Sequence, residues 1–309
     1  MTSALGKNID QKLVSIIMPT FQHGHCIDKS INSVINQTYQ NWELLVIDNY
    51  SQDNTEDVLK QYDDPRVIYY KYLNNGVIAA SRNFGISQSK GSWLAFLDSD
   101  DWWSSRKLEK SLHNAFLNEA DIVFHDLYLV KNENQKFFVS KARGRKIKEK
   151  IFDDLLTYGN ALLNSSVVVR KEILIKVGGI SEDLDKISWE DYDCWLRISQ
   201  ITNKFLYINE ALGFYWVGGG NTSTPSTVLK NTASIEVNYK NYFQNPACKP
   251  FWLGNGRGKA FLDTRMYNQA IKEFKSIDRN TIKSIDWLKV KYRMIQIYFI
   301  KMKEKFFYK

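Results

Sequence analysis

Several features that define other classes of protein are scarce in this sequence. It contains three cysteines, Cys26, Cys194 and Cys248, which show neither metal-ligand spacing nor a disulfide framework. They predict buried thiols in a reducing compartment. The four histidines also lack ligand spacing, and we interpret His23 and His25, which follow the first predicted strand, as turn residues. A disulfide scaffold and a zinc site built on these residues are therefore not expected.

Long apolar runs are absent too. Residues 1–11 lack the apolar stretch of a secretory signal. No apolar run approaches the roughly 20 residues that a membrane-spanning helix needs. Neither tandem repeats nor a linker rich in proline and glycine stands out. We therefore expect a cytoplasmic protein.

The composition that is present fits a packed globular chain. With 309 residues, 44% of them hydrophobic and 25% charged, the sequence can form one large domain and a smaller appendage. The net charge is +8, and residues 281–309 alone carry eight basic side chains against two acidic ones. Positive charge concentrated at one end indicates a surface partner for that segment rather than a basic catalytic groove.

Short apolar runs alternate with amphipathic stretches through the first half of the chain. The predicted strands are Val14–Met18, Trp42–Asp48, Val67–Tyr72, Trp93–Leu97 and Asp121–Phe124, and the predicted helices are Cys26–Gln37, Asp53–Gln61, Val77–Ser89 and Arg106–Asn118. This alternation predicts βαβ units and an α/β fold with a mostly parallel, doubly wound sheet. The strands run into polar residues at their carboxyl ends, which is the edge where such sheets bind ligands.

The second half is expected to complete the sheet and then become helical. We predict a loop or hairpin over Lys131–Lys150, strands at Asn164–Arg170 and Phe205–Ile208, and helices at Asp191–Ser199, Ala260–Phe274 and Ile285–Phe306. The pattern predicts two domains, residues 1–225 and a helical extension over residues 226–309.

The most specific motif is Asp98-Ser99-Asp100-Asp101 at the end of the fourth predicted strand. In an extended segment the side chains of Asp98 and Asp100 project to the same face. Two converging carboxylates bind a hard cation such as Mn²⁺ or Mg²⁺, which in turn can hold a diphosphate. The alternative is that Asp100 or Asp101 only caps the helix that begins near Ser104.

Other polar residues are expected at the same edge of the sheet. Asp48 ends the second strand and can accept from a base or ribose, or can be a turn acid. Pro19-Thr20-Phe21 follows the first strand and can present backbone groups to a base, or can form a plain turn. Arg82 lies in the helix after the third strand, where it either faces a phosphate or base or is structural.

A second acidic motif, Trp189-Glu190-Asp191-Tyr192-Asp193, opens a predicted helix. Acids in a first helical turn are favoured by the helix dipole, so the motif can be a helix start only. Alternatively, Asp191 is a general base that takes the proton of a weakly nucleophilic sugar hydroxyl. The aromatic side chains beside it would then cover a sugar face.

Four stretches together resemble glycosyltransferase family 2. PTFQ, VIDNYSQDNT, NNGVIAASRNFGISQSKGSWLAFLDSDD and WEDYDCWLRI occur in that family's order between residues 14 and 223. The resemblance implies the GT-A, or nucleotide-diphospho-sugar transferase, fold. It is strongest with bacterial enzymes that build O-antigen or capsule polysaccharides. It implies the transfer of a single hexose or N-acetylhexosamine from a UDP-sugar to a glycan or a polyprenyl-diphosphate-linked acceptor, with inversion.

The resemblance also implies a role for each matching residue. Asp191 would be the catalytic base and Glu190 would orient the acceptor, beside Trp189 and Tyr192. Asp100 would bind the metal. The donor side would consist of Asp48 at the uracil, Arg82 at the base or diphosphate, Asp98 at the ribose, and Pro19, Thr20, Phe21 and Ser99.

The chain departs from the family pattern at Asn49, at residues 215–218 and in lacking the motif of processive synthases. Asn49 stands where relatives usually carry a second Asp. Residues 215–218 read Tyr-Trp-Val-Gly where relatives often have Tyr-Arg-x-His, so a histidine near the metal or diphosphate is missing. Residues 218–221 form a glycine-rich stretch that is either a loop closing over the donor or only a turn. The Gln-x-x-Arg-Trp motif of processive synthases is absent, which predicts the addition of one sugar.

The basic tail contains a regular apolar stripe. Leu288, Tyr292, Ile295, Phe299, Met302 and Phe306 recur at steps of four and three, with Lys289, Arg293 and Lys303 on another face. Such a helix either contacts the inner surface of an anionic membrane or packs on the protein's own helices. The first possibility suits an acceptor carried on a polyprenyl diphosphate.

Two other functions remain open at this level. A haloacid-dehalogenase-type phosphatase also uses an Asp-x-Asp motif, but normally after its first strand. A non-catalytic module that binds sugars or nucleic acids would explain the aromatics and the charge. No RNA or DNA motif occurs, so no nucleic-acid partner is expected.

Overall fold

The computed structural model describes residues 11–132, 135, 137–218, 224–243 and 249–307. The chain divides into two compact units. The first contains Met1–Phe152, Asn160–Leu184 and Glu190–Gly220, and the second contains Asp153–Gly159, Asp185–Trp189 and Asn221–Lys309. Two short segments from the middle of the sequence thus belong to the second unit. The domain boundary predicted between residues 225 and 226 stays a prediction.

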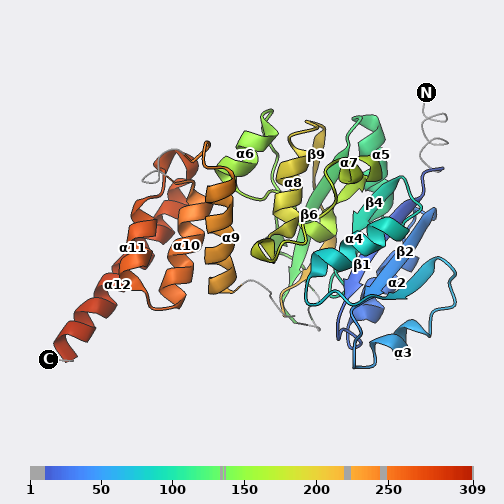
Figure 1. Cartoon of the computed structure of the whole chain (residues 1–309), viewed down its shortest axis with the longest axis horizontal. Helices are drawn as coiled ribbons and strands as arrows, with labels where there is room; N and C mark the ends of the chain where they lie inside the picture. The colour runs from blue at the N-terminus through green and yellow to red at the C-terminus, as the bar shows by residue number, and fades with distance from the viewer. Residues whose placement is uncertain (1–10, 133–134, 136, 219–223, 244–248, 308–309) are drawn as a thin grey trace. The chain divides into compact units, whose positions relative to one another are not determined.

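The first unit is built on one sheet with the strand order β3-β2-β1-β4-β8-β6-β9-β5, and β7 pairs with β6. Figure 1 labels five of these strands, β1, β2, β4, β6 and β9. The strands are β1 (Val14–Thr20), β2 (Trp42–Asp48), β3 (Val67–Lys71), β4 (Trp93–Phe96), β5 (Trp102–Trp103), β6 (Ile122–Val130), β7 (Lys141–Ala142), β8 (Val168–Arg170) and β9 (Phe205–Trp216). The helices are α2 (Ile27–Ile35), α3 (Thr55–Leu59), α4 (Ile78–Gln88), α5 (Lys107–Leu117), α7 (Lys171–Lys176) and α8 (Glu190–Ile198). The helix α6 (Ile151–Tyr158) begins in the first unit and belongs to the second from Asp153 onward.

The sheet is parallel in its first half and mixed in its second. β3, β2, β1 and β4 run parallel to one another, as the βαβ pattern predicts. β8 then pairs antiparallel with both β4 and β6, whereas β6 and β9 are parallel. The parallel half places the carboxyl ends of β1, β2 and β4 at one edge, so the polar residues that follow these strands are neighbours.

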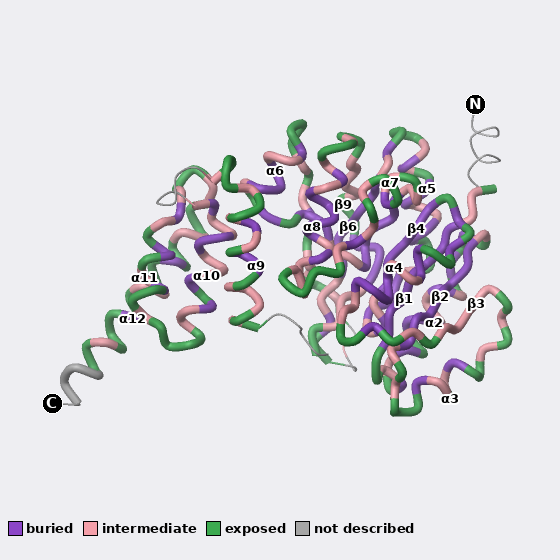
Figure 2. Tube along the Cα trace, viewed as in Figure 1, coloured by how far each residue is buried: buried purple, intermediate pink, exposed green. Residues whose placement is uncertain are grey.

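The core of the first unit lies on both faces of the parallel strands. Every residue of β1 and β2 is buried, which explains their continuous apolar sequences (Figure 2). The apolar sides of α2 and α5 pack against these strands, and Trp42 and Trp93 are among the fully buried side chains. This packing gives the polar edge of the sheet a rigid support.

The outcome for three further predicted elements varies. Asn164–Ser166 form a 3₁₀ turn rather than the start of a strand, because the Ser166 hydroxyl donates to the carbonyl of Leu163 at 2.7 Å and competes with strand pairing. Within Lys131–Lys150 the hairpin alternative holds, since β7 pairs with β6. Phe205–Ile208 is only the first part of the longer strand β9.

The second unit contains α9 (Pro225–Asn238), α10 (Phe251–Asp263), α11 (Tyr267–Lys275) and α12 (Ser284–Phe307). The single helix predicted over Ala260–Phe274 is wrong. Arg265 adopts a left-handed backbone with φ of 60°, which ends α10 and turns the chain into α11. The two helices then pack closely, since a Cβ atom on Gly258 would lie 2.3 Å from the Phe274 ring. None of the helices in the described part of the chain is long and apolar enough to cross a membrane.

Candidate active site

Asp98 lies just after β4 and is held by neighbouring side chains. Its Oδ1 accepts hydrogen bonds from Arg82 Nη2 at 2.8 Å and from Asn164 Nδ2 at 3.3 Å. Its backbone N–H donates to the Ser165 hydroxyl at 3.2 Å. The 3₁₀ turn at the start of the predicted strand therefore holds Asp98 together with Arg82.

Arg82 joins the two acidic motifs. It is buried in α4, and its Nη1 donates to Glu190 Oε1 at 2.6 Å while Nη2 holds Asp98. Burial alone disfavours its charge, but the carboxylates of Asp98 and Glu190 outweigh that cost and raise the pKa of Arg82. Glu190 Oε2 is buried without a hydrogen-bond partner. Arg82 thus brings residues 98 and 190 to one place, although they are far apart in sequence.

Asp191, in the first turn of α8, is next to Glu190 and partly buried. Its Oδ1 accepts from the backbone N–H of Tyr192 at 2.6 Å, and its Oδ2 lies 3.4 Å from Asn160 Nδ2. Burial and then the Glu190 charge raise the pKa of Asp191 to about 7, although the positive charge of Arg82 opposes them. A carboxylate with this pKa can exchange a proton at neutral pH.

Asp100 and Asp101 are crowded by negative charge. Burial and the nearby Asp98 raise the pKa of Asp100 to about 6. Burial, Asp98 and Asp100 also raise the pKa of Asp101, whose Oδ2 has no partner and whose Oδ1 accepts from the backbone N–H of Trp216 at 2.9 Å. The helix-cap alternative for these two acids is wrong, because α5 begins after Arg106 and has no side-chain cap.

The acids fit a divalent cation that is also bound by a substrate. Asp98, Asp100, Asp101, Glu190 and Asp191 place five carboxyl groups at this edge, which we call the acid edge. Among the described residues no group of three or more His, Cys, Asp or Glu side chains could hold a metal by itself. Mg²⁺ and similar ions are often bound by one or two carboxylates together with substrate phosphates. Asp100 suits that arrangement, because its pKa is raised by burial and then by repulsion from Asp98, and a cation would relieve that repulsion.

The predicted donor residues are placed around the ends of β1 and β2. Asp48 is fully buried; its Oδ1 accepts from the Ser51 backbone at 3.0 Å and hydroxyl at 2.5 Å, and its Oδ2 from the Tyr69 hydroxyl at 2.8 Å. The turn-acid interpretation therefore describes this structure. Thr20 is buried with no partner for its hydroxyl, whereas Phe21 is exposed. Pro19 lies within β1.

Two departures from the family pattern have structural roles. Asn49 Oδ1 accepts from the backbone N–H of Asn74 at 2.9 Å, which ties the end of β2 to the loop before α4. Trp216 uses its backbone N–H to hold Asp101, so the end of β9 is fixed to the acid edge. Of the glycine-rich stretch that follows, residues 219–221 lie outside the described residues.

Several contacts at the acid edge were not predicted from the sequence. His23 Nδ1 lies 2.7 Å from the hydroxyl of Ser99, so a residue interpreted as part of a turn contacts the middle of the acidic motif. Asn164 and Asn160 were not singled out. Burial, followed by Asp101, Asp98 and Asp100, raises the pKa of Tyr215 to about 12, which marks it as a neighbour of these acids. Nothing in the local sequence indicates these contacts, because each joins segments distant in the chain.

The predicted acceptor residues belong to different parts of the structure. Tyr192 is buried in the first unit. Trp189 belongs to the second unit, where its ring lies 5.7 Å from that of Trp252. Their role in acceptor binding stays a prediction.

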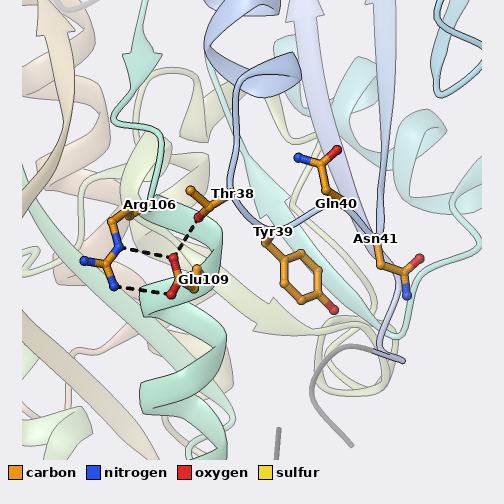
Figure 3. A pocket seen from close by; sticks show the side chains of 6 residues that line it. All are labelled: Thr38, Tyr39, Gln40, Asn41, Arg106 and Glu109. Atoms are coloured by element: carbon orange, nitrogen blue, oxygen red, sulfur yellow. Dashed lines mark hydrogen bonds and ion pairs between the residues drawn. The ribbon is translucent and has the colours of Figure 1, made fainter. Parts of the chain in front are cut away.

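Figure 3 shows a pocket in the first unit. It is lined by Thr38, Tyr39, Gln40, Asn41, Arg106 and Glu109. Glu109 accepts from the Thr38 hydroxyl at 2.7 Å and from Arg106 at 3.2 Å. The two charged side chains of the pocket, Arg106 and Glu109, thus pair with each other. The pocket contains none of the predicted site residues.

Comparison with known families decides the class of this protein. Residues 15–178 match the family model described as glycosyl transferase family 2. The chain belongs to this family. The family 2 membership confirms the resemblance seen in the motifs and makes the protein a glycosyltransferase, which decides against a phosphatase and a non-catalytic module.

Two named relatives of this family 2 glycosyltransferase are bacterial glycosyltransferases. It is 32% identical over 198 residues to UDP-Glc:alpha-D-GlcNAc-diphosphoundecaprenol beta-1,3-glucosyltransferase WfgD of Escherichia coli, covering 63% of this chain and 73% of WfgD. It is 38% identical over 115 residues to the putative teichuronic acid biosynthesis glycosyltransferase TuaG of Bacillus subtilis, covering 36% of this chain and 44% of TuaG.

Solved structures confirm the GT-A fold. S. aureus TarS 1-349 in complex with UDP-GlcNAc superimposes with a TM-score of 0.58 at 18% identity, covering 93% of this chain and 81% of that one. The mannosyltransferase PcManGT from Pyrobaculum calidifontis, in complex with GDP-Man and Mn²⁺, gives a TM-score of 0.54 at 12% identity, covering 85% of this chain and 73% of that one. At these identities the likeness establishes the fold alone.

Proposed function

We propose that this family 2 glycosyltransferase moves a single hexose or N-acetylhexosamine from a UDP-sugar to a glycan on a polyprenyl diphosphate, with inversion. The product would enter O-antigen or capsule synthesis. The name of WfgD supports the donor and the lipid-linked acceptor, and the complex of TarS with UDP-GlcNAc supports a UDP-sugar. An acceptor of this kind lies at a membrane surface, so we propose that the enzyme works at the cytoplasmic face.

The observation that carries the proposal is the bridge made by Arg82. Its two terminal nitrogens hold Asp98 at 2.8 Å and Glu190 at 2.6 Å, so the acidic motif after β4 and the start of α8 meet. An inverting transferase needs its leaving diphosphate and its attacking hydroxyl on opposite sides of one anomeric carbon. The bridge supports a site with the donor at residues 98–101 and the acceptor at Glu190 and Asp191.

In the proposed step, Asp191 acts as general base. Its carboxylate takes the proton from the acceptor hydroxyl as that oxygen attacks the anomeric carbon from the side opposite to the diphosphate. The bond from the anomeric carbon to the diphosphate oxygen breaks, and its electron pair leaves with UDP. An α-linked donor sugar therefore becomes β-linked. The pKa of about 7 for Asp191 supports this role, because a base titrating near neutral pH can accept the proton and release it again.

Glu190 and Arg82 are proposed as positioning residues. Arg82 fixes Glu190 Oε1 and leaves Oε2 buried without a partner. A buried carboxylate oxygen without a donor is costly, and a sugar hydroxyl would satisfy it. We therefore propose that Glu190 Oε2 orients the acceptor.

Asp100 is proposed as the side chain that holds Mn²⁺ or Mg²⁺. Such an ion, bound also by the donor diphosphate, would neutralise the negative charge that develops on the leaving UDP. On the donor side we retain Pro19, Thr20, Phe21, Asp48, Arg82, Asp98 and Ser99, and on the acceptor side Trp189 and Tyr192, as proposed contacts. Thr20 is the best supported after Arg82, because its buried hydroxyl has no partner.

The test is UDP release from a panel of UDP-sugars with Mn²⁺, measured with and without a polyprenyl-diphosphate-linked acceptor. Release from one donor should rise when acceptor is added. Asp191→Asn should reduce the acceptor-dependent rate on the order of 1,000-fold while leaving the affinity for UDP unchanged.

Asp193→Asn is the matched control. Asp193 lies on the same helix but pairs with Arg197 at 2.8 Å, so its replacement should affect stability and leave transfer intact. Equal loss of UDP binding and turnover in Asp191→Asn would assign Asp191 to structure and contradict the mechanism. Absence of UDP release from every donor in the panel would contradict the UDP-sugar assignment.

A further inference from the structure

The last helix, α12, has two apolar rows, and the first holds it on the second unit. Val290 and Ile297 are fully buried against Phe274 and Ile277, and Trp287 and Met294 pack on the same cluster. Two polar contacts secure the orientation. Arg293 Nη1 donates to Asn255 Oδ1 at 2.8 Å, and Lys301 Nζ donates to Asn268 Oδ1 at 2.6 Å. The rotation of α12 about its axis is therefore determined.

The second row is the apolar stripe seen in the sequence, and it points away from that cluster. We call it the outer row; it comprises Leu288, Tyr292, Ile295, Phe299 and Met302, which are between 51% and 62% exposed. The side chain of Phe306, the last residue of the predicted stripe, lies outside those that the structure describes. Steps of four and three residues keep them on one face of the helix. The alternative that this stripe packs on the protein's own helices does not hold within the second unit. There the opposite face of α12 makes the contacts.

A row of five large exposed apolar side chains needs a partner. Single exposed apolar residues are ordinary on protein surfaces, but a continuous row exposes a patch of the kind that marks an interaction site. Exposed lysines border it: Lys289 and Lys303 lie on one side, and Lys291 lies on the other. The outer row itself contains no acidic residue.

The charge around the row favours an anionic surface as the partner. Residues 281–309 carry eight basic and two acidic side chains, and one of the acids, Asp286, already pairs with Lys289 at 2.9 Å. A second copy of this helix would bring two strongly positive segments together, which is unfavourable. A bilayer containing anionic lipid accepts apolar side chains and attracts the lysines around them.

We propose that α12 lies flat on an anionic bilayer, with the outer row inserted between the lipid headgroups and the lysines at their phosphates. The first row, which contains Val290 and Ile297, stays packed on the second unit during this contact. No part of the unit therefore has to unfold. This proposal does not depend on the proposed reaction, because a chain without transferase activity would bind the bilayer equally.

Co-sedimentation of the full chain with vesicles tests the proposal. The chain should bind vesicles of phosphatidylcholine mixed with phosphatidylglycerol and bind phosphatidylcholine alone at least about tenfold more weakly. The triple variant Leu288→Gln, Ile295→Gln and Phe299→Gln should bind the mixed vesicles on the order of tenfold more weakly than the parent. Replacing Lys289, Lys291 and Lys303 by Gln should remove the preference for phosphatidylglycerol.

A matched control uses exposed apolar residues that form no row. Leu117, Ile175 and Val237 are between 60% and 71% exposed and lie on three different helices. Replacing them by Gln should leave vesicle binding unchanged. Because all the substituted side chains are exposed, circular dichroism and UDP release should match those of the parent in all three triple variants.

Two results would overturn the proposal. One is equal vesicle binding by the parent and the outer-row variant. The other is a parent that binds neither kind of vesicle and sediments as a dimer, while the outer-row variant sediments as a monomer. A second copy of the chain would then cover the outer row. Loss of UDP release from every donor, with vesicle binding intact, would instead count against the proposed reaction only.

Discussion

Each unit contains a cluster of charged side chains, and the two clusters differ in balance. In the second unit Glu236 and Glu273 face Lys249 and Arg257. Lys249 Nζ lies 3.1 Å and 3.0 Å from the two glutamates, and Arg257 contacts both of them as well. Two acids and two bases pair with each other there, so the charges of this cluster balance.

The acid edge of the first unit is unbalanced. Of its five carboxyl groups, those of Asp98 and Glu190 pair with Arg82. The pKa values of the other three, Asp100, Asp101 and Asp191, are all raised. Raised values mean that burial and mutual repulsion disfavour the charged forms. The comparison teaches that a balanced buried cluster supports a fold, whereas an unbalanced one retains free energy that binding of a cation or a proton can release.

Removing Arg82 should have the largest effect. Arg82→Gln leaves Asp98 and Glu190 without their shared partner, and breaking a buried pair in this way costs about 3–5 kcal/mol. We expect that loss in the free energy of unfolding from urea titration, together with loss of acceptor-dependent UDP release. Arg82→Lys keeps the charge but cannot reach both acids, so it should recover part of the stability. Unchanged stability in Arg82→Gln would mean that the acids do not depend on this bridge.

Asp100→Ala should weaken donor binding on the order of 100-fold in Mn²⁺, or about 2.7 kcal/mol, because the metal would lose its protein ligand. Calorimetric titration with UDP measures this. The parent in the presence of a chelator is the matched control and should bind UDP as weakly as the variant does. A variant that binds UDP as the parent does in Mn²⁺ would contradict the assignment of the metal to Asp100.

Glu273→Gln should lower the free energy of unfolding by about 2 kcal/mol, because Lys249 and Arg257 then share Glu236. Turnover should remain at the parental level wherever the variant is folded, since the balanced cluster has no proposed role in the reaction. Asp185→Asn, which breaks the exposed pair with Lys230, is the control and should cost less than about 0.5 kcal/mol. Loss of turnover in folded Glu273→Gln would show that the two clusters are not separable.

Asp191→Asn should stabilise the protein at high pH. The pKa of Asp191 is about 7 in the folded chain, against the ordinary 3.8, so the folded state binds more protons than the unfolded state between these values. Stability therefore falls as pH rises through this range and levels off above about pH 7. Relative to the parent, the variant should gain about 1 kcal/mol between pH 5 and pH 8, after allowance for partial exposure. A gain independent of pH would contradict the raised pKa.

Much of the first unit follows from local sequence. The parallel direction of β1, β2, β3 and β4 is predicted, because continuous apolar strands alternate with amphipathic helices. The position of Asp98 and Asp100 at the end of β4 follows from the same pattern. The turn at Asn164–Ser166 and the break at Arg265 could not be predicted, because a hydroxyl contact and one left-handed residue decide them.

The sequence by itself determined the family, the acidic motifs and the amphipathic period of the last helix, because these depend on residues close together in the chain. The tertiary structure decided three further things: that Arg82 joins Asp98 to Glu190, that Asp191 has a raised pKa, and that the outer row of α12 faces outward. Each of these depends on which distant segments are packed side by side, since burial and electrostatic interaction act through space rather than along the chain.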